Sequence, residues 1–495
     1  MRRIPDLINP SAALFRAMTC KIRRYGLKGG LAAIAAISLL PAGCATVPPQ
    51  PGFHSLANTV SRRTGRRIIW DDNAKADRQI RVAIAGLLSH NLSPDAAVQI
   101  ALLKNPALQA DYERLGISEA NLVQAGLLRN PVFSFDLRFP ARPYHGWDAS
   151  IDQTFLDLLF LNVRKGIARA KFAARKAEVA ANVLNLAASV KTAFYKVQSD
   201  EQLLHLDKKI RMAAHDGLRF ARHLRQAGNI AQLLYDEQLA LYQQSRLTYA
   251  NAEAQMLEDR EVLTALMGLW GAHAAWRIQP HLPPVPGTDP RLTGLESLAI
   301  RQSLAIRAAR SRLLAAVRTL KMAGAAGVLS GATVGLNYVR DPDVASTLGP
   351  AISIPLPLFN QGQPAIARAR AKFLADCRKI DAIAVNLRAA VRRRWVSLIA
   401  ARHAAVFYRR ILLPLRKRIF KETQLAYNGM YAGPYPLLLA RQREIRAMRK
   451  AVQTAGDYWI ARAALENTIG GMLPAGQAGH IAIPSRKPAG KTNHK

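Results

Sequence analysis

The stretch IPLPLFNQ, at residues 354–361, decides the fold, because an alternating, strand-like segment ends there and a long helical segment begins. Proline cannot donate to the hydrogen-bond ladder of a sheet, so Pro355 and Pro357 are expected to end the strand and to set the bend into the helix. A related junction, FLN at residues 160–162, lies about 200 residues earlier. Similar segments surround both junctions, which indicates an internal repeat.

The repeat extends outward from the two junctions. The motif IARA follows the first junction at residues 167–170 and the second at residues 366–369. Two further pairs keep nearly the same spacing: NPAL at 105–108 with RQSL at 301–304, and AGNIAQLL at 227–234 with AGPYPLL at 432–438. Residues 279–290, which hold five prolines, are predicted to be a linker. We therefore predict a first repeat over 93–278 and a second over 291–471.

Each repeat holds a pair of segments in which apolar and polar residues alternate. Such alternation with a period of two is typical of strands with one apolar face. The apolar positions that we predict to face the membrane are Phe133, Phe135, Leu137, Phe139, Trp147 and Ile151 in the first repeat, and Val334, Leu336, Tyr338, Ile352 and Ile354 in the second.

Long helical segments follow each strand pair. Residues 163–226 contain no proline, and their apolar residues recur at the four-three spacing of a coiled coil. At a rise of 1.5 Å per residue they would form a rod of about 90–100 Å. Glycines near residues 228 and 433 are expected to reverse the chain into a second helix, which Gly268 and Gly470 would end.

Four strands with one apolar face present a problem of closure. If that face meets lipid, the sheet has to close, because unpaired strand edges are not tolerated in hydrocarbon. Four strands are too few, whereas three copies give twelve. The predicted fold class is therefore α plus membrane β: a two-fold repeat of helix, β-hairpin and long coiled-coil helices, whose trimer forms a 12-stranded β-barrel continuing into an α-helical barrel. A soluble sheet that packs on its own helices stays open as the alternative.

The N-terminal residues have the pattern of an export signal. Basic residues precede the apolar stretch 31–40, and small residues lead to Cys44. The cysteine after Ala42-Gly43 resembles a bacterial lipobox, which implies cleavage after residue 43 and lipidation of Cys44. We therefore predict a lipoprotein-type signal peptide over 1–43 and a tether with a periplasmic segment over 44–92. Two alternatives stay open: ordinary cleavage of the signal peptide near this position with an incidental cysteine, and a start of the chain at Met18 rather than Met1.

Three stretches together resemble TolC-family outer-membrane efflux proteins, with the cation-efflux type the most similar: LVQAGLLRNP at 122–131, IPLPLFNQ at 354–361 and YWIARA at 458–463. The resemblance implies a trimeric twelve-stranded barrel in the outer membrane and an α-helical tunnel across the periplasm. It also implies docking to a periplasmic adaptor (a membrane fusion protein) and to an inner-membrane pump.

The family closes its periplasmic entrance at the tips of the helical hairpins, often with an acidic ring. The second tip, residues 427–436, has no carboxylate, so such a ring is not carried over. The tyrosines there recur every four residues and could share one helix face as an aromatic constriction, or could be packing residues. The positions predicted to form the gate or to contact the adaptor are Gly228, Asn229, Leu233, Tyr427, Tyr431, Gly433 and Tyr435.

The charge of the chain first suggests nucleic acid as a partner. Its 495 residues include 70 Lys and Arg against 33 Asp and Glu, a formal net charge of +37. Export removes the chain from cytoplasmic nucleic acid, so we predict no nucleic-acid partner. If the positive charge lines the lumen, the open pore should weakly prefer anions. The tail 472–495, rich in Gly, Pro and Lys, is predicted to be disordered.

No motif in the sequence carries catalytic chemistry. The three cysteines are too few for a disulfide framework, and the histidines have no metal-ligand spacing. We therefore predict no enzyme, catalytic residue, metal site or cofactor. The predicted function is the outer-membrane channel of a tripartite efflux system, a passive conduit for metal ions or small toxic compounds. A type I secretion conduit and a lipid-anchored periplasmic coiled-coil scaffold are the alternatives.

Overall fold

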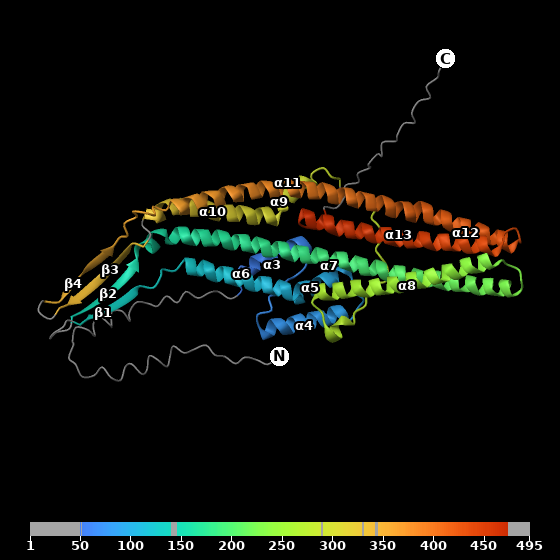
Figure 1. Ribbon diagram of the computed structural model, residues 1–495, viewed down its shortest axis with the longest axis horizontal. Helices are drawn as coiled ribbons and strands as arrows, with labels where there is room; N and C mark the ends of the chain where they lie inside the picture. The colour runs from blue at the N-terminus through green and yellow to red at the C-terminus, as the bar shows by residue number, and fades with distance from the viewer. Residues whose placement is uncertain are drawn as a thin grey trace, which may run out of the picture. The chain divides into compact units, whose positions relative to one another are not determined.

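The computed structural model describes residues 50, 52–139, 146–288, 291–328, 331–341 and 345–473 (Figure 1). The chain divides into two compact units, Met1–Val47 and Pro48–Lys495, and every described residue belongs to the second. The predicted signal peptide, the lipidation of Cys44 and nearly all of the predicted tail lie outside the described residues.

The order of elements follows the predicted repeat. The N-terminal helices are α3 (Phe53–Thr64) and α4 (Ala74–Leu88). The first repeat has α5 (Pro94–Lys104), α6 (Pro106–Ala125), β1 (Val132–Arg138), β2 (Gly146–Thr154), α7 (Phe155–Gln226), α8 (Gln232–Met267) and the short 3-10 helix η1 (Gly271–Ala274). The second has α9 (Leu295–Gln302), α10 (Leu304–Val328), β3 (Thr333–Arg340), β4 (Thr347–Ser353), α11 (Gln363–Phe407), the π-helix η2 (Tyr408–Leu412), α12 (Leu413–Asn428) and α13 (Pro434–Ile469).

Equivalent residues begin and end equivalent helices in the two repeats. The side chain of Asn105 accepts a hydrogen bond from the backbone N–H of Leu108 and caps α6, and Ser303 does the same for the N–H of Ile306 in α10. Gly268 and Gly470 end α8 and α13 with φ of 70° and 83°, a left-handed conformation that glycine adopts without strain.

The four strands form one antiparallel sheet in the order β1-β2-β3-β4. Its register pairs Phe133 with Ile151 and Val334 with Ile352, so the predicted apolar positions within the strands share one face. Phe139 and Ile354 lie one residue beyond the ends of β1 and β4. β1 and β4 are the edges of the sheet: among the described strands, β1 pairs only with β2 and β4 only with β3.

Two boundaries differ from the simplest expectation. Helix α7 begins at Phe155, directly after β2 ends at Thr154. The junction between strand and helix therefore lies several residues before FLN. The long helix of the second repeat is interrupted by η2, which Pro414 follows closely. A proline inside an α-helix removes one hydrogen bond and clashes with the preceding turn, and a π-turn is a common local accommodation.

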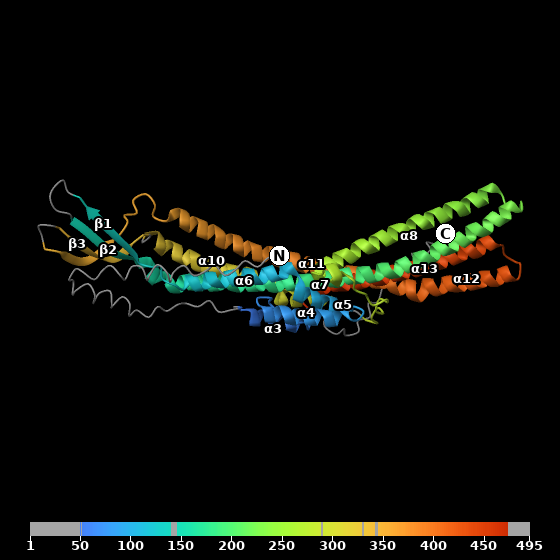
Figure 2. The same ribbon diagram turned by 90° about the horizontal axis from the view of Figure 1, so that it is seen from below.

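The main core lies where α3, α5, α6, α7 and α8 meet. Tyr112 is fully buried there, with its ring 5.1 Å from that of Phe53 and 6.1 Å from that of Trp70. Each such buried side chain contributes about 1.5–3 kcal/mol. A smaller core joins α9, α11 and α13. Within this unit the sheet lies at one end of the helices, and both ends of the helical layer bend away from α3 and α4 (Figure 2).

Candidate functional site

The apolar face of the sheet is exposed in the single chain. Phe133 and Ile352 are 65% and 69% exposed, and an aromatic row crosses three strands, with the ring of Trp147 5.7 Å from Phe135 and 4.9 Å from Tyr338. An exposed apolar patch of this kind marks an interaction surface.

The opposite face of the sheet is polar and mainly acidic. Asp136 lies directly across from Asp148, and the guanidinium of Arg138 bridges Asp148 and Asp341 at 2.8 and 2.9 Å. The hydroxyl of Ser150 donates to Asp152 at 3.0 Å. The two faces of one sheet therefore differ sharply in polarity.

The first hairpin tip has the predicted glycine turn. Gly228 adopts φ 73°, and the N–H of Asn229 donates to the carbonyl of Leu224 at 2.8 Å. Leu233, at the start of α8, is 69% exposed. An exposed leucine beside a tight turn leaves an apolar contact point at the end of the hairpin.

The second tip is built differently from the expectation. Gly433 has φ −75°, and Met430 takes the left-handed conformation with φ 60°, so the chain reverses there without a left-handed glycine. Helix α12 ends at Asn428, which puts Tyr427, Tyr431 and Tyr435 on a helix, a loop and the next helix rather than on one face. Tyr431 and Met430 are more than 90% exposed.

The chain is similar to known proteins in sequence and in fold. A family model described as "Outer membrane efflux protein" matches residues 97–269. The chain carries an outer membrane efflux protein domain. That domain lies within the predicted first repeat, and the predicted resemblance to TolC-family proteins is confirmed. No curated protein sequence matches the chain closely.

Solved structures of membrane proteins share the fold of this chain. A membrane protein from Pseudomonas aeruginosa has a TM-score of 0.64 and 17% identity, over 76% of this chain and 92% of that one. CusC has a TM-score of 0.61 and 13% identity, over 80% of this chain and 92% of CusC. VceC from Vibrio cholerae has a TM-score of 0.61 and 17% identity, over 80% of this chain and 97% of VceC. At these identities the likeness shows the fold.

Buried polar contacts join the long helices. Lys196 in α7 contacts Asp259 in α8 at 2.6 Å. Burial, and the neighbouring Asp259 carboxylate, raise the pKa of Asp200 to about 7. Asp207 in α7 forms an ion pair with Arg449 in α13 at 3.2 Å, and burial raises the pKa of Asp207. These contacts were not predicted, because a carboxylate on a long helix reads as a solvated residue until its neighbours are known.

The described residues hold no group of three or more His, Cys, Asp or Glu side chains that could ligate a metal ion. Within the same residues, no helix is both long and apolar enough to cross a membrane. Cys377 is a half-buried free thiol on α11.

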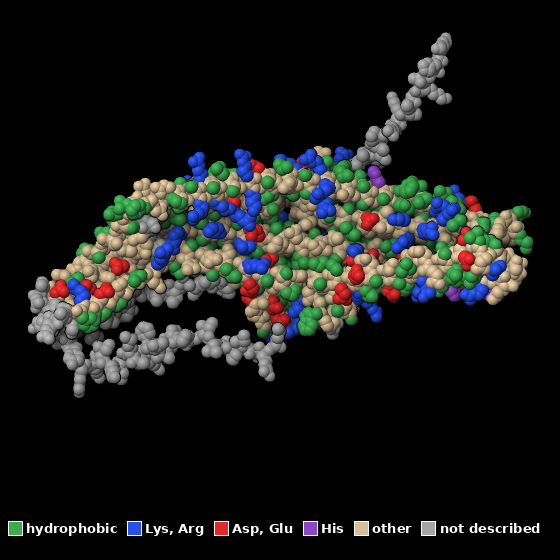
Figure 3. Space-filling view, viewed as in Figure 1, with side chains coloured by type: hydrophobic (Ala, Val, Ile, Leu, Met, Phe, Trp, Pro, Cys, Tyr) green, Lys and Arg blue, Asp and Glu red, His purple; other side chains and the backbone are tan. Residues whose placement is uncertain are grey.

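Positive side chains of the chain gather on the helices rather than on the sheet. On the face in Figure 3, Lys and Arg lie densely over the stretch of α7, α10 and α11. Part of this charge lines a groove between α6, α7 and α10, which sequence reasoning missed. The signal was present in Arg164, Lys171 and Arg175, whose spacings of seven and four place them on one side of α7.

Proposed function

We propose that this protein is the outer-membrane channel of a tripartite efflux system, a passive trimeric conduit from periplasm to exterior for metal ions or small toxic compounds. The observation that carries the proposal is the open four-stranded sheet, apolar on one face and polar on the other, joined directly to long helical hairpins. The domain match to outer membrane efflux proteins supports it.

The geometry of the sheet supports three copies. The edges β1 and β4 would leave rows of unpaired N–H and C=O groups in hydrocarbon, and each such group costs several kcal/mol. Pairing β4 of one copy with β1 of the next removes both edges, and three copies make twelve strands, an even number within the range of outer-membrane barrels. The apolar face then meets lipid and the polar face lines the pore.

The remaining parts of the chain take their places in this proposal. Residues 93–278 and 291–471 are the two efflux repeats, and 279–290 is the linker between them. In the stretch 44–92, the lipid-anchored Cys44 and the tether that follows it hold the chain at the outer membrane, and the periplasmic segment contains α3 and α4. The exposed tip residues Leu233, Met430 and Tyr431 offer apolar contacts to a periplasmic adaptor that links the channel to an inner-membrane pump.

The conduit does no chemistry of its own. A tube that lowers the barrier to passage needs no catalytic residue and no cofactor, and the direction of transport comes from the pump. The polar strand face, with Asp136, Asp148 and Asp152 against Arg138, would give the outer opening a local excess of negative charge.

Membrane fractionation combined with gel mobility tests the proposal. We expect the native protein in the outer membrane, migrating as a trimer that boiling converts to a single chain. A monomer in the soluble periplasmic fraction would contradict the channel and would favour a scaffold.

Deletion of the gene tests the cargo. We expect greater sensitivity to at least one metal or organic toxicant, restored by the intact gene. Unchanged tolerance to all of them would contradict efflux and would favour protein secretion.

A further inference from the structure

We infer that the groove between α6, α7 and α10 is a binding site for an amphipathic organic anion, a compact apolar molecule that carries one acidic group. The groove has a volume of about 770 Å³, within the range of sites that hold small molecules. It lies outside both hairpin tips and outside the sheet.

The walls of the groove are strongly cationic. Its lining includes a single carboxylate, that of Glu178, against five cationic side chains, which are Arg114, Arg164, Lys171, Arg175 and Arg312. Three different helices supply them, so the concentration of charge comes from packing rather than from one basic run of sequence. Like charges this close repel each other, and a bound anion would relieve that repulsion.

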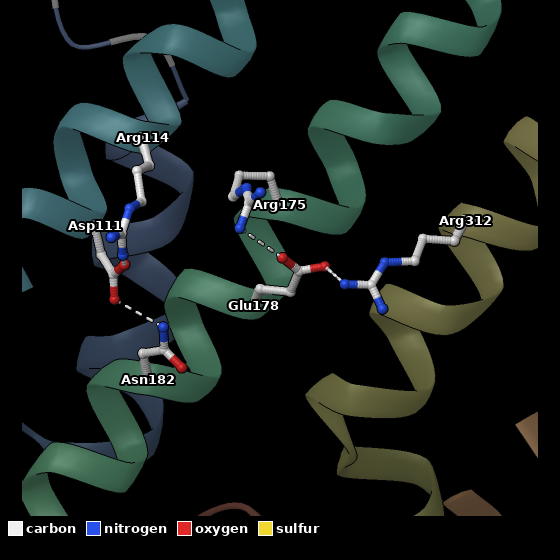
Figure 4. A network of polar contacts seen from close by, with 6 residues as sticks. All are labelled: Asp111, Arg114, Arg175, Glu178, Asn182 and Arg312. Carbon is white, nitrogen blue, oxygen red and sulfur yellow. Dashed lines mark hydrogen bonds and ion pairs between the residues drawn. The ribbon is translucent and has the colours of Figure 1, made fainter. Parts of the chain in front are cut away.

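The few acidic groups nearby are already shared (Figure 4). Glu178 accepts from Arg175 at 2.9 Å and also from Arg312, so one carboxylate neutralises only one of two guanidinium groups. Arg114 pairs with Asp111 at 2.8 Å, and the other oxygen of Asp111 accepts from the amide of Asn182 at 2.7 Å. Among the described residues, Lys171 has no hydrogen-bond or ion-pair partner.

Apolar side chains also line the groove. Ile117, Ile167 and Met322 are among them. Ile117 is 62% exposed to solvent, an unusual position for an isoleucine between packed helices. Guanidinium groups beside exposed apolar side chains fit a ligand with an acidic head and an apolar body better than they fit a bare inorganic anion.

The groove faces the conduit if the proposed function holds. Phe172 and Lys176, which contact the α3 region, lie on another side of α7 from Lys171 and Arg175. The helical layer bends away from α3, which therefore lies on its convex side (Figure 2). In the proposed channel we place α3 outside the tube, so that the groove, on another side of α7, opens toward the conduit. This placement rests on the proposed function, whereas binding itself does not.

Titration of the purified full-length protein in nonionic detergent tests the site. The probe is naphthalene-1-sulfonate, with 1-naphthylmethylammonium and inorganic sulfate as comparisons. We expect the sulfonate to bind at least tenfold more tightly than either. Equal binding of the ammonium probe would show an apolar surface only, and equal binding of sulfate would show that the apolar side chains of the groove contribute nothing to binding. Either result overturns the proposal.

Two substitutions of opposite sign sharpen the test. Lys171→Gln removes an unpaired cation and should weaken sulfonate binding two- to fivefold, about the effect of one partly exposed charge pair. Glu178→Gln removes the only carboxylate of the groove and should tighten binding by a similar factor. An apolar surface would respond to neither change.

Arg169→Gln is the matched control, because Arg169 is exposed on α7 but points about 200° away from Lys171 around the helix. Binding should stay unchanged in this variant. Equal weakening of sulfonate binding by Arg169→Gln and Lys171→Gln would overturn the site. A folded Glu178→Gln protein that binds the sulfonate less tightly than the unchanged protein would also overturn it. A protein that forms a pore but binds no sulfonate contradicts the groove alone, and one that binds but forms no pore contradicts the proposed function alone.

Discussion

The two long hairpins of the molecule share a repeat pattern but differ in continuity. Helix α7 runs unbroken for 72 residues, whereas its counterpart is divided into α11, η2 and α12. The part of α7 that corresponds to α12 buries Ala214, Leu218 and Ala221, whereas α12 has no buried residue. The same sequence pattern can therefore build one rigid hairpin and one with a weak point.

The contacts between the paired helices show the same contrast. In the first hairpin, Lys196 contacts Asp259 at 2.6 Å and Arg260 contacts Glu201 at 3.5 Å, both between α7 and α8. In the second hairpin, the guanidinium of Arg441 in α13 lies 4.9 Å from the ring centre of Phe420 in α12. We expect the second hairpin to separate at a lower cost in free energy.

The largest effect should come from moving the proline between hairpins. Lys209 in α7 corresponds to Pro414 by the offset of the two tip motifs, and it is exposed. Lys209→Pro should destabilise the protein by about 3 kcal/mol or more, because it breaks a continuous helix. Pro414→Ala should be neutral or stabilising, since η2 already accommodates the proline. Thermal unfolding followed by circular dichroism measures both, and equal losses in the two variants would remove the contrast.

A smaller effect is expected at the ion pair that joins the hairpins. Arg449→Gln leaves the buried carboxylate of Asp207 unpaired and should cost about 2 kcal/mol, a value reduced from that of a fully buried pair because Arg449 is partly exposed. The double variant Asp207→Asn with Arg449→Gln should recover part of the loss. A double variant as unstable as the sum of both singles would show that the pair does not couple the hairpins.

The smallest effect concerns pH and the first hairpin. The pKa of Asp200 is raised to about 7 in the folded protein, above its usual value, so the folded state binds the proton more tightly than the unfolded state. Stability should therefore fall as pH rises from about 4 to above 7. Asp200→Asn should stabilise the protein by about 1 kcal/mol at pH 8 and have little effect at pH 4.5. An equal effect at both pH values would contradict this account.

Local periodicity in the sequence predicted the features that depend on a single helix or strand. Alternation located the apolar strand positions, and the heptad spacing located the buried Val183, Val190 and Val197 of α7. The shared face of Tyr427, Tyr431 and Tyr435 failed, because the helix stops at Asn428 and periodicity cannot cross a turn. The groove and the buried carboxylates could not be predicted, since they depend on which helices pack together.

A pore measurement sharpens the contrast between the acidic strand face and the basic helical face. The excess of positive charge on the helices should give the reconstituted channel a weak preference for anions, because the helical stretch is the longer part of the conduit. The reversal potential in a salt gradient measures it. A strong preference for cations would show that Asp136, Asp148 and Asp152 control passage instead.

Cross-linking of the two sheet edges tests directly whether three copies of the chain close into one barrel. Ser134 in β1 and Ala351 in β4 lie on the polar face at opposite edges of one sheet, so a short link between them has to join different copies. With Cys377 replaced by Ser, Ser134→Cys and Ala351→Cys in one chain should give, with a short bismaleimide in intact cells, species of two and three chains and nothing larger. Single chains only, or a ladder that continues beyond three, would contradict a closed barrel of three copies.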